Sequence, residues 1–568
     1  MTFQENAKQW LTPPFDEETQ KQVSVLQKDL EKLEDAFYTN LSFGTGGMRG
    51  IMGVGTNRIN KYTLGKATQG LSEFLKEEYP NETLKVVVAF DSRHQSKELA
   101  KVVADIFTAN SIHCYLFSDL RPTPELSFAV RHLNAHCGIV LTASHNPPEY
   151  NGYKVYGKDG GQIVPPIDSK IIRIIENTTF DTIRFEGKTS LLHYIDEEVD
   201  NAYHQTVLDV AQIHQIPKEK FHLVFTPIHG TSITAFPQVL KKAGYKNVHI
   251  VAEQEKPDGA FPTVPSPNPE TPEALQMALD LAKKKNADLI IGTDPDADRL
   301  GIVVKDKKNN WKFLNGNQIM MILTEYLLDK KNKQGILTPK HFIASTIVST
   351  PAIKKMATHY NIQFKECLTG FKWIAKLIED QPELTFVGGG EESFGYLVGD
   401  TVRDKDAISA SLLACEIAVE AIANGTNLYE LLAECYAKYG AYKERLISDN
   451  KPGKKGVEEI NALMEGFRIN PPKTIAETRV LSVSDFQKGI TIDVLTKEES
   501  KIVLPKANVL LFKLEDGTQI ALRPSGTEPK IKYYFSVNQE FNSQKTWEEQ
   551  EAALEKRLDR FENSFKAL

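Results

Sequence analysis

Two short stretches carry side chains whose types and spacing could do chemistry. The first, Thr-Ala-Ser-His-Asn-Pro at 142–147, follows the apolar run 138–141. That run predicts a short buried strand, and the prolines at 147 and 148 must end it, so Ser144 is expected just beyond the strand's carboxyl end. Ligands bind at that edge of open α/β sheets. Ser144 is therefore a candidate nucleophile, and an ordinary polar turn before proline is the alternative.

The second stretch places Asp294, Asp296 and Asp298 directly after the apolar run 287–291. Alternate residues of an extended chain share one face, so three carboxylates can converge on one cation. An EF-hand loop requires Gly at its sixth position and Glu at its twelfth, where this chain has Arg299 and Lys305. We therefore exclude an EF-hand and expect one Mg²⁺ per chain, because all-oxygen ligands favour a hard ion. A solvated acidic turn is the alternative.

Two further loops could hold a phosphorylated ligand. In Arg-Pro-Ser-Gly-Thr (523–527), Arg523 can grip a phosphate with two bonds, while hydroxyls and a glycine permit close approach. In Gly-Glu-Glu-Ser (390–393), Glu391 can accept hydrogen bonds from two hydroxyl groups. A plain turn is the alternative at 523–527.

Five motifs, in their chain order, resemble the α-D-phosphohexomutase family, which includes phosphoglucomutases and phosphomannomutases. They are Phe-Gly-Thr-Gly-Gly-Met-Arg-Gly (43–50), Thr-Ala-Ser-His-Asn-Pro (142–147), Asp-Pro-Asp-Ala-Asp-Arg (294–299), Gly-Glu-Glu-Ser (390–393) and Arg-Pro-Ser-Gly-Thr-Glu-Pro (523–529). The set spans most of the chain and is highly specific. The length and the sequence after Ser393 are similar to the longer phosphoglucomutase and phosphopentomutase branch.

The resemblance implies a mutase that interconverts glucose 1-phosphate and glucose 6-phosphate through a phosphoserine and glucose 1,6-bisphosphate. Mannose and pentose phosphates are alternative substrates, because residue identities do not reveal the sugar. A phosphoserine phosphatase and a non-catalytic sugar-phosphate sensor are the rival functions. Many family members continue after the serine with Gly-His, whereas this chain reads Phe394-Gly395-Tyr396, which leaves a histidine acid or base there in doubt.

The expected site residues fall into four groups, each numbered in this sequence. The catalytic group contains Ser144, His145, Lys154 and Arg49. The substrate-binding group contains Thr369, Gly370, Lys372, Glu391, Ser393, Arg403 and Arg299. The phosphate-binding group contains Arg523, Ser525, Gly526 and Thr527. The metal ligands are Ser144, through its phosphate, with Asp294, Asp296 and Asp298.

Composition bounds the remaining possibilities. The 568 residues are 41% hydrophobic and 25% charged, which is ordinary for a globular protein. A net charge of -7 gives no basic field for nucleic acid or anionic membrane, so a small sugar phosphate is the expected partner. The five cysteines show no paired spacing and predict free thiols in a reducing cytoplasm. The oligomeric state is left as monomer or homodimer.

The elements that must position these residues alternate between strand and helix, which predicts an α/β fold with mostly parallel sheets. We expect three mixed α/β domains, 1–205, 206–316 and 317–448, and a C-terminal α+β domain, 449–568, around a central cleft. A single amphipathic helix is predicted over 16–37, and a hinge near 448–456. At the end of the predicted strand 85–90, Asp91 and Arg93 are expected to pair with each other.

Overall fold

The computed structural model describes residues 2–44, 46–211, 216–451, 453–525 and 530–566. The chain divides into two compact units, each described here by itself. The first contains residues 1–316 and 371–428, and the second contains 317–370 and 429–568. Both units are built from mixed α/β sheets, so the expected fold class is confirmed.

The first sheet carries the Ser144 loop. Its strand order is β1-β5-β4-β2-β3-β6, with β2 (Lys85–Phe90), β3 (His113–Phe117), β4 (Cys137–Leu141) and β6 (Leu192–Ile195) parallel. The strands β1 (Gly47–Ile51) and β5 (Tyr150–Tyr156) extend it antiparallel. The parallel strands are almost continuously apolar, as burial on both faces requires.

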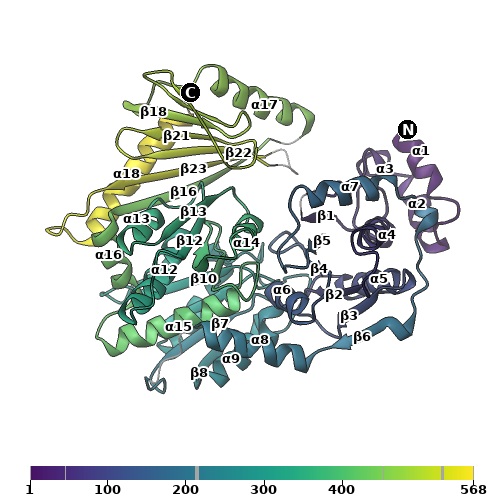
Figure 1. The fold of residues 1–568 in the computed structure, drawn as a ribbon, viewed down its shortest axis with the longest axis horizontal. Helices are drawn as coiled ribbons and strands as arrows, with labels where there is room; N and C mark the ends of the chain where they lie inside the picture. The colour runs from purple at the N-terminus through teal and green to yellow at the C-terminus, as the bar shows by residue number, and fades with distance from the viewer. Residues whose placement is uncertain (1, 45, 212–215, 452, 526–529, 567–568) are drawn as a thin grey trace. The chain divides into compact units, whose positions relative to one another are not determined.

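Helices cover both faces of this sheet (Figure 1). Core residues of α4 (Lys61–Glu78), α5 (Ser96–Ala109) and α7 (Ile167–Asn177) pack on Val86, Val88 and Ile139. On the other face, α6 (Thr123–His132) contacts β2 and β4 so closely that a Cβ at Gly138 would lie 2.5 Å from Val130. This packing fixes β4, and with it the start of the Ser144 loop.

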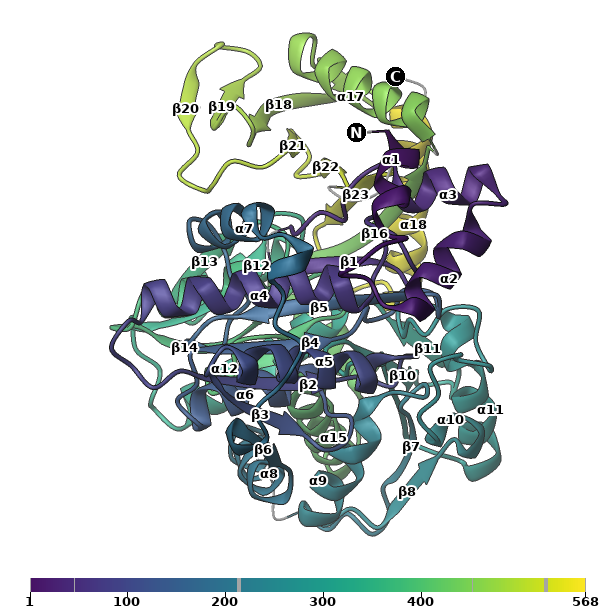
Figure 2. The same ribbon diagram turned by 90° about the vertical axis from the view of Figure 1, so that its right-hand side faces the viewer.

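Three short helices precede the first sheet and pack against α4 (Figure 2). They are α1 (Phe3–Gln9), α2 (Glu17–Leu26) and α3 (Leu30–Phe37). The prediction of one helix over 16–37 is therefore wrong. Asp29 interrupts it because its side chain accepts from the backbone N–H of Lys32 and caps a new helix.

A second sheet carries the aspartate loop. Its order is β11-β10-β9-β7-β8, with β7 (His222–Thr226), β8 (Asn247–Ile250) and β9 (Leu289–Thr293) parallel. The strands β10 (Leu300–Lys305) and β11 (Trp311–Leu314) continue antiparallel. The aspartates lie in the tight turn between β9 and β10. The first unit also contains the antiparallel pair β14 (Thr385–Gly390) and β15 (Tyr396–Val398), then α15 (Ala407–Ala423).

The second unit contains the parallel pair β12 (His341–Thr346) and β13 (Gln363–Cys367), and a larger antiparallel sheet. That sheet has the order β16-β23-β22-β21-β18-β19-β20 and is covered by α18 (Trp547–Lys566). Its inner and far strands are β18 (Thr478–Asp485), β19 (Ile490–Asp493), β20 (Glu499–Lys501), β21 (Leu510–Leu514) and β22 (Gln519–Pro524). The strand β16 (Ala441–Asn450) pairs along its whole length with β23 (Lys530–Gln539), and α17 starts at Gly453. These two elements, β16 and α17, occupy residues 448–450 and 453–456 of the predicted hinge, and a hinge movement there stays a prediction.

Within the described residues, no single helix combines the length and the hydropathy of a membrane span. The consecutive helices α15 and α16 (Leu428–Tyr439) reach that threshold only when they are counted together across their break.

Candidate active site

Ser144 lies in a strained turn immediately after β4. Its side chain is buried, and its φ of 51° is in the left-handed region, which non-glycine residues rarely adopt. Ser144 Oγ donates a hydrogen bond to Asp294 Oδ2 at 2.6 Å and lies 3.2 Å from His145 Nδ1. Strain of this kind concentrates at functional sites. Two predicted site motifs, 150 residues apart in the chain, therefore meet at one hydroxyl group.

The three aspartates form one buried carboxylate cluster, which we call the aspartate triad. Ligand atoms from Asp294, Asp296 and Asp298 all lie within 4.8 Å of one another, and the residues are 0%, 0% and 2% exposed. The backbone N–H groups of Asp298 and Arg299 donate to Asp294 Oδ1 and hold the turn. Oδ1 atoms of Asp296 and Asp298 are buried without a hydrogen-bond partner. Converging, unsatisfied carboxylate oxygens fit a hard divalent cation.

Two lysines balance part of the negative charge of the triad. Lys154 Nζ, on β5, lies 2.6 Å from Asp296 Oδ2 and 3.0 Å from Asp298 Oδ2. Lys405 Nζ lies 3.1 Å from the same oxygen of Asp298. Burial opposes ionisation of Asp298, but these cations outweigh it and lower its pKa. Burial and repulsion by the other two carboxylates raise the pKa of Asp294.

Lys405 is absent from the predicted site residues, although Arg403, two residues earlier on the same charged loop, is among them. The side chain of Arg403 approaches Asp400 at 3.7 Å, and no ion pair with the triad is found for it among the described residues. The glycine at 395 is the sequence feature that indicates the place of the Lys405 side chain, because a Cβ at residue 395 would lie 2.1 Å from Lys405 Cδ. The departure from the Gly-His pattern therefore makes room for a lysine beside the triad.

The predicted sugar-binding loop borders the same cluster. Glu391 follows β14, is 6% exposed, and its backbone N–H donates to the carbonyl of Gly395. Burial, aided by Glu392 and opposed by Lys405, raises the pKa of Glu391 to about 7. Ser393, further along the loop, is half-buried. Arg299 forms an ion pair with Glu270 and lies 3.9 Å from Asp298 Oδ1, so its charge also faces the triad.

Arg49 lies beside the Ser144 loop. It is exposed on β1, and its Nη1 donates to Asn146 Oδ1 at 2.8 Å. Gly47, two residues before it, is required by packing, since a Cβ there would lie 1.9 Å from the carbonyl oxygen of Tyr153. The first unit thus places Arg49 against Asn146 of the loop, His145 near the Ser144 hydroxyl and Lys154 at the carboxylates.

Most of the other predicted substrate- and phosphate-binding residues belong to the second unit or lie outside the described residues. Lys372 begins α14 (Lys372–Glu379) in the first unit, whereas Thr369 and Gly370 belong to the second. Arg523 ends β22 (Gln519–Pro524) in the second unit, and the Ser525 N–H donates to the carbonyl of Lys530. Gly526 and Thr527 lie outside the described residues. The phosphate clamp at 523–527 stays a prediction.

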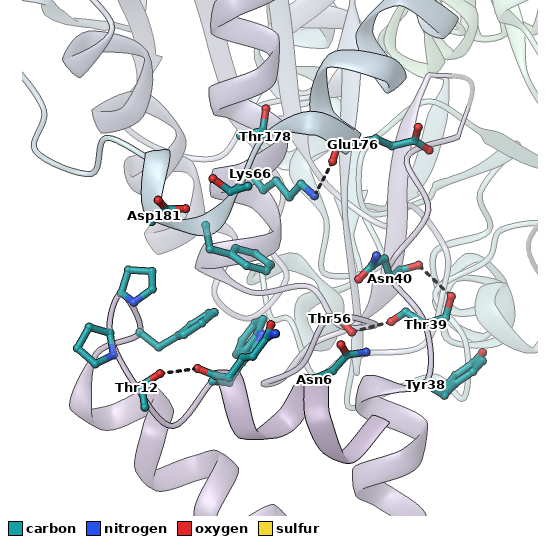
Figure 3. Close-up of a pocket in the computed structure, with 17 residues that line it drawn as sticks. Asn6, Thr12, Tyr38, Thr39, Asn40, Thr56, Lys66, Glu176, Thr178 and Asp181 are labelled. Atoms are coloured by element: carbon teal, nitrogen blue, oxygen red, sulfur yellow. Dashed lines mark hydrogen bonds between the residues drawn. The ribbon is translucent and has the colours of Figure 1, made fainter. Parts of the chain in front are cut away.

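A separate hollow of about 780 Å³ lies between the N-terminal helices and the α4 and α7 region (Figure 3). Lys66 extends into it and donates to the backbone carbonyl of Glu176 at the end of α7. Trp10, Phe15 and Phe180 supply its apolar wall. This hollow contains none of the predicted site residues, so it is distinct from the Ser144 cluster.

The fold and site together define a multidomain α/β protein organised around a carboxylate triad and a serine that contacts it. Profiles of the phosphoglucomutase/phosphomannomutase alpha/beta/alpha domains I, II and III match residues 40–182, 201–308 and 315–439. The chain belongs to this family, as the motif resemblance implied.

Relatives that are named for their activity support the same assignment. The chain is 39% identical over 515 residues to a phosphoglucomutase of Staphylococcus epidermidis, covering 89% of this chain and 92% of that protein. It is 38% identical over 518 residues to a phosphoglucomutase of Staphylococcus aureus, covering 90% and 92%. The solved structure of the phosphoglucomutase pp63/parafusin of Paramecium has a TM-score of 0.66 at 19% identity, covering 90% and 92%, and shares the fold.

Proposed function

We propose that this chain is a phosphoglucomutase that interconverts glucose 1-phosphate and glucose 6-phosphate through a phosphoryl group carried on Ser144. The observation that carries the proposal is the 2.6 Å contact between Ser144 Oγ and the aspartate triad. Relatives with 38–39% identity over most of the chain, named phosphoglucomutases, support the choice of reaction and sugar. A bisphosphorylated glucose is the intermediate between the two half-reactions.

The triad is the proposed Mg²⁺ site. Asp294, Asp296 and Asp298 would hold the ion, together with an oxygen of the phosphorylated Ser144. Bound there, Mg²⁺ would supply neutralising charge to the phosphoryl group. Its requirement for oxygen ligands matches the two buried Oδ1 atoms that have no hydrogen-bond partner.

The chain's own residues account for the rest of the reaction. When the phosphoryl group leaves Ser144, the bond between Oγ and phosphorus breaks and a bond from a sugar hydroxyl to phosphorus forms. The sugar hydroxyl loses a proton and Oγ gains one. His145 Nδ1, 3.2 Å from Oγ, is positioned to exchange that proton. Lys154 and Lys405 keep positive charge beside the carboxylates throughout.

The remaining predicted residues have binding roles in this proposal. Glu391 and Ser393 would accept and donate hydrogen bonds to sugar hydroxyls, so that either end of the sugar can face Ser144. Arg523, with its neighbouring hydroxyls, would hold the phosphate that is not reacting. We further propose a cytoplasmic enzyme, monomer or homodimer, that acts on small sugar phosphates without nucleic acid or membrane partners.

The test follows glucose 1-phosphate with purified protein and distinguishes glucose 6-phosphate from free phosphate. We expect isomer formation by the wild type, loss of it in Ser144→Ala, and near-normal activity in Ser72→Ala. Ser72 is a matched control because it is a fully buried serine that donates to a carbonyl within α4. Free phosphate as the product would favour the phosphatase rival, and activity in Ser144→Ala would refute the proposal. Mannose 1-phosphate and ribose 1-phosphate, run in parallel, test the sugar.

A further inference from the structure

Arg93 is a buried arginine directly beneath the Ser144 loop. It follows β2, the parallel neighbour of β4, and its side chain is fully buried. The guanidinium group donates to four backbone carbonyl oxygens of that loop. Nη2 donates to Ser144 at 2.7 Å and to Asn146, and Nη1 donates to Pro147 at 2.8 Å and Tyr150 at 2.9 Å. Arg93 therefore binds both ends of the loop that carries Ser144, from Ser144 itself to Tyr150.

Arg93 is itself fixed by a buried carboxylate. Its backbone N–H donates to Asp91 Oδ1 at 2.9 Å, and Nε lies 3.4 Å from Asp91 Oδ2. Ser96 Oγ donates to the same Oδ1, and Asn151 Nδ2 donates to Ser96. The expected pairing of Asp91 with Arg93 is thus present, but it is one part of a network that returns to the loop after Ser144.

The same guanidinium contacts the part of the chain that carries the aspartate triad. Its central carbon lies 5.0 Å from the ring centroid of Phe261, in the connection between β8 and β9. A Cβ at Gly259 would lie 2.4 Å from the backbone nitrogen of His94, so these backbones are in direct contact. Arg93 therefore joins the loop of Ser144 to the sheet of the aspartates.

Local hydrogen bonds hold parts of the loop, since the Ser144 N–H donates to Thr142 Oγ1 at 2.8 Å and the Asn146 N–H donates to the Ala143 carbonyl at 3.1 Å, whereas Arg93 spans the loop from Ser144 to Tyr150. Pro147 and Pro148 lack backbone N–H groups, and Ser144 keeps a left-handed φ of 51°. A planar guanidinium can satisfy several carbonyl oxygens from one fixed position, which the single ammonium of lysine cannot reproduce. The identity of the residue at 93, and not only its charge, thus determines the geometry.

We propose that Arg93 is a positioning residue that aligns Ser144 Oγ with the aspartate triad for phosphoryl transfer. The proposal rests on the proposed function of Ser144. Arg93 acts on the reaction only through the loop, so its loss should lower kcat and leave the KM for sugar phosphate nearly unchanged. A displacement of about 1 Å can cost about a hundredfold in rate, and we expect a loss of that order in Arg93→Lys.

The experiment compares Arg93→Lys and Arg93→Ala with Arg468→Lys. Arg468 is a matched control because its side chain is 7% exposed and pairs with Asp485, outside the proposed catalytic and binding residues. Added guanidinium, at non-denaturing millimolar concentration, should raise the kcat of Arg93→Ala at least about tenfold, since it can occupy the cavity that the substitution leaves. It should not change the activity of the control. Hydrogen exchange of the backbone amides within residues 144–152 should be faster in both Arg93 variants than in the wild type and unchanged in Arg468→Lys.

Several results would overturn the proposal. They are a wild-type kcat in Arg93→Lys, a loss expressed mainly in KM, or unchanged exchange in the loop despite lost activity. If Arg93→Ala does not accumulate as folded protein, the kcat and KM of Arg93→Lys alone test the proposal. Failure of the proposed function is recognised separately, because Ser144→Ala would then retain mutase activity whatever the behaviour of the Arg93 variants.

Discussion

Replacing Lys154 by methionine perturbs the charge balance of the aspartate triad while keeping an apolar stem of similar length. Lys154 Nζ contacts Asp296 Oδ2 at 2.6 Å and Asp298 Oδ2 at 3.0 Å. At an effective dielectric constant of about 20, these contacts attract by about 6 kcal/mol each, and desolvation cancels much of that attraction. Removing one partner of a buried ion pair costs about 3–5 kcal/mol of folding stability. We expect the free energy of unfolding of metal-free Lys154→Met to be lower than that of the wild type by that amount.

The same substitution should strengthen Mg²⁺ binding. In the wild type an incoming cation competes with the Lys154 ammonium for two carboxylate oxygens, whereas in Lys154→Met those oxygens are available. Burial opposes the charge on Lys154, but Asp296 and Asp298 outweigh it and raise the pKa of Lys154, so the competitor is charged at neutral pH. We expect Kd for Mg²⁺ to fall at least about tenfold, or about 1.4 kcal/mol, although activity falls.

Titration calorimetry on chelator-treated protein, with thermal unfolding in the presence and absence of Mg²⁺, measures both effects. Lys218→Met is the matched control, because Lys218 pairs with Glu416 at a site where the two side chains are 5% and 0% exposed. It should lose stability without any change in Mg²⁺ affinity. Unchanged or weaker Mg²⁺ binding in Lys154→Met, or equal tightening in the control, would refute the reasoning.

Three further outcomes follow from the site. Because the pKa of Glu391 is raised to about 7, its ionised form is lost as pH falls below 7, and the KM for sugar phosphate should rise below that pH. Steady-state kinetics of Glu391→Gln should show a high KM at every pH. Gly395→Ala should displace Lys405, since the new Cβ would lie 2.1 Å from Lys405 Cδ. The kcat of this variant should fall about tenfold or more, and a normal kcat would exclude Lys405 from the reaction. Arg523→Met should weaken glucose 6-phosphate binding in calorimetry by about 1.5–3 kcal/mol, the contribution of charge-assisted hydrogen bonds; unchanged binding would remove the clamp from the account.

The sequence singles out Ser144 and the aspartates, which the structure brings together, better than it singles out the residues around them. Ser144 and the triad were identified because each follows an apolar strand, beyond whose carboxyl end ligands bind in open α/β sheets, and because the alternate spacing of the aspartates suits a cation. Lys405 carries no such pattern, and only the glycine at 395 marks the space that its side chain occupies. The role of Arg93 is hidden because its partners are backbone carbonyls, which any residue type supplies.

The errors in the predicted elements also have physical causes. The helix predicted over 16–37 contains a second cap at Asp29, which divides an otherwise continuous amphipathic pattern. The segment 448–456 has the charged and glycine-containing composition of a linker, so its composition did not indicate that β16 extends to Asn450 through its pairing with β23. Local composition does not reveal a partner strand that lies about eighty residues further along the chain.

The measurement that tests the central claim most directly follows the phosphoryl group itself. Enzyme is incubated with glucose 1,6-bisphosphate carrying ³²P and digested, and the labelled peptide is sequenced. A chase with unlabelled glucose 1-phosphate then follows the label into sugar. The account predicts label on Ser144, transfer of that label to sugar at a rate no slower than turnover, and no label in Ser144→Ala. Isomerisation without labelled Ser144, or a label that the sugar cannot remove, would contradict it.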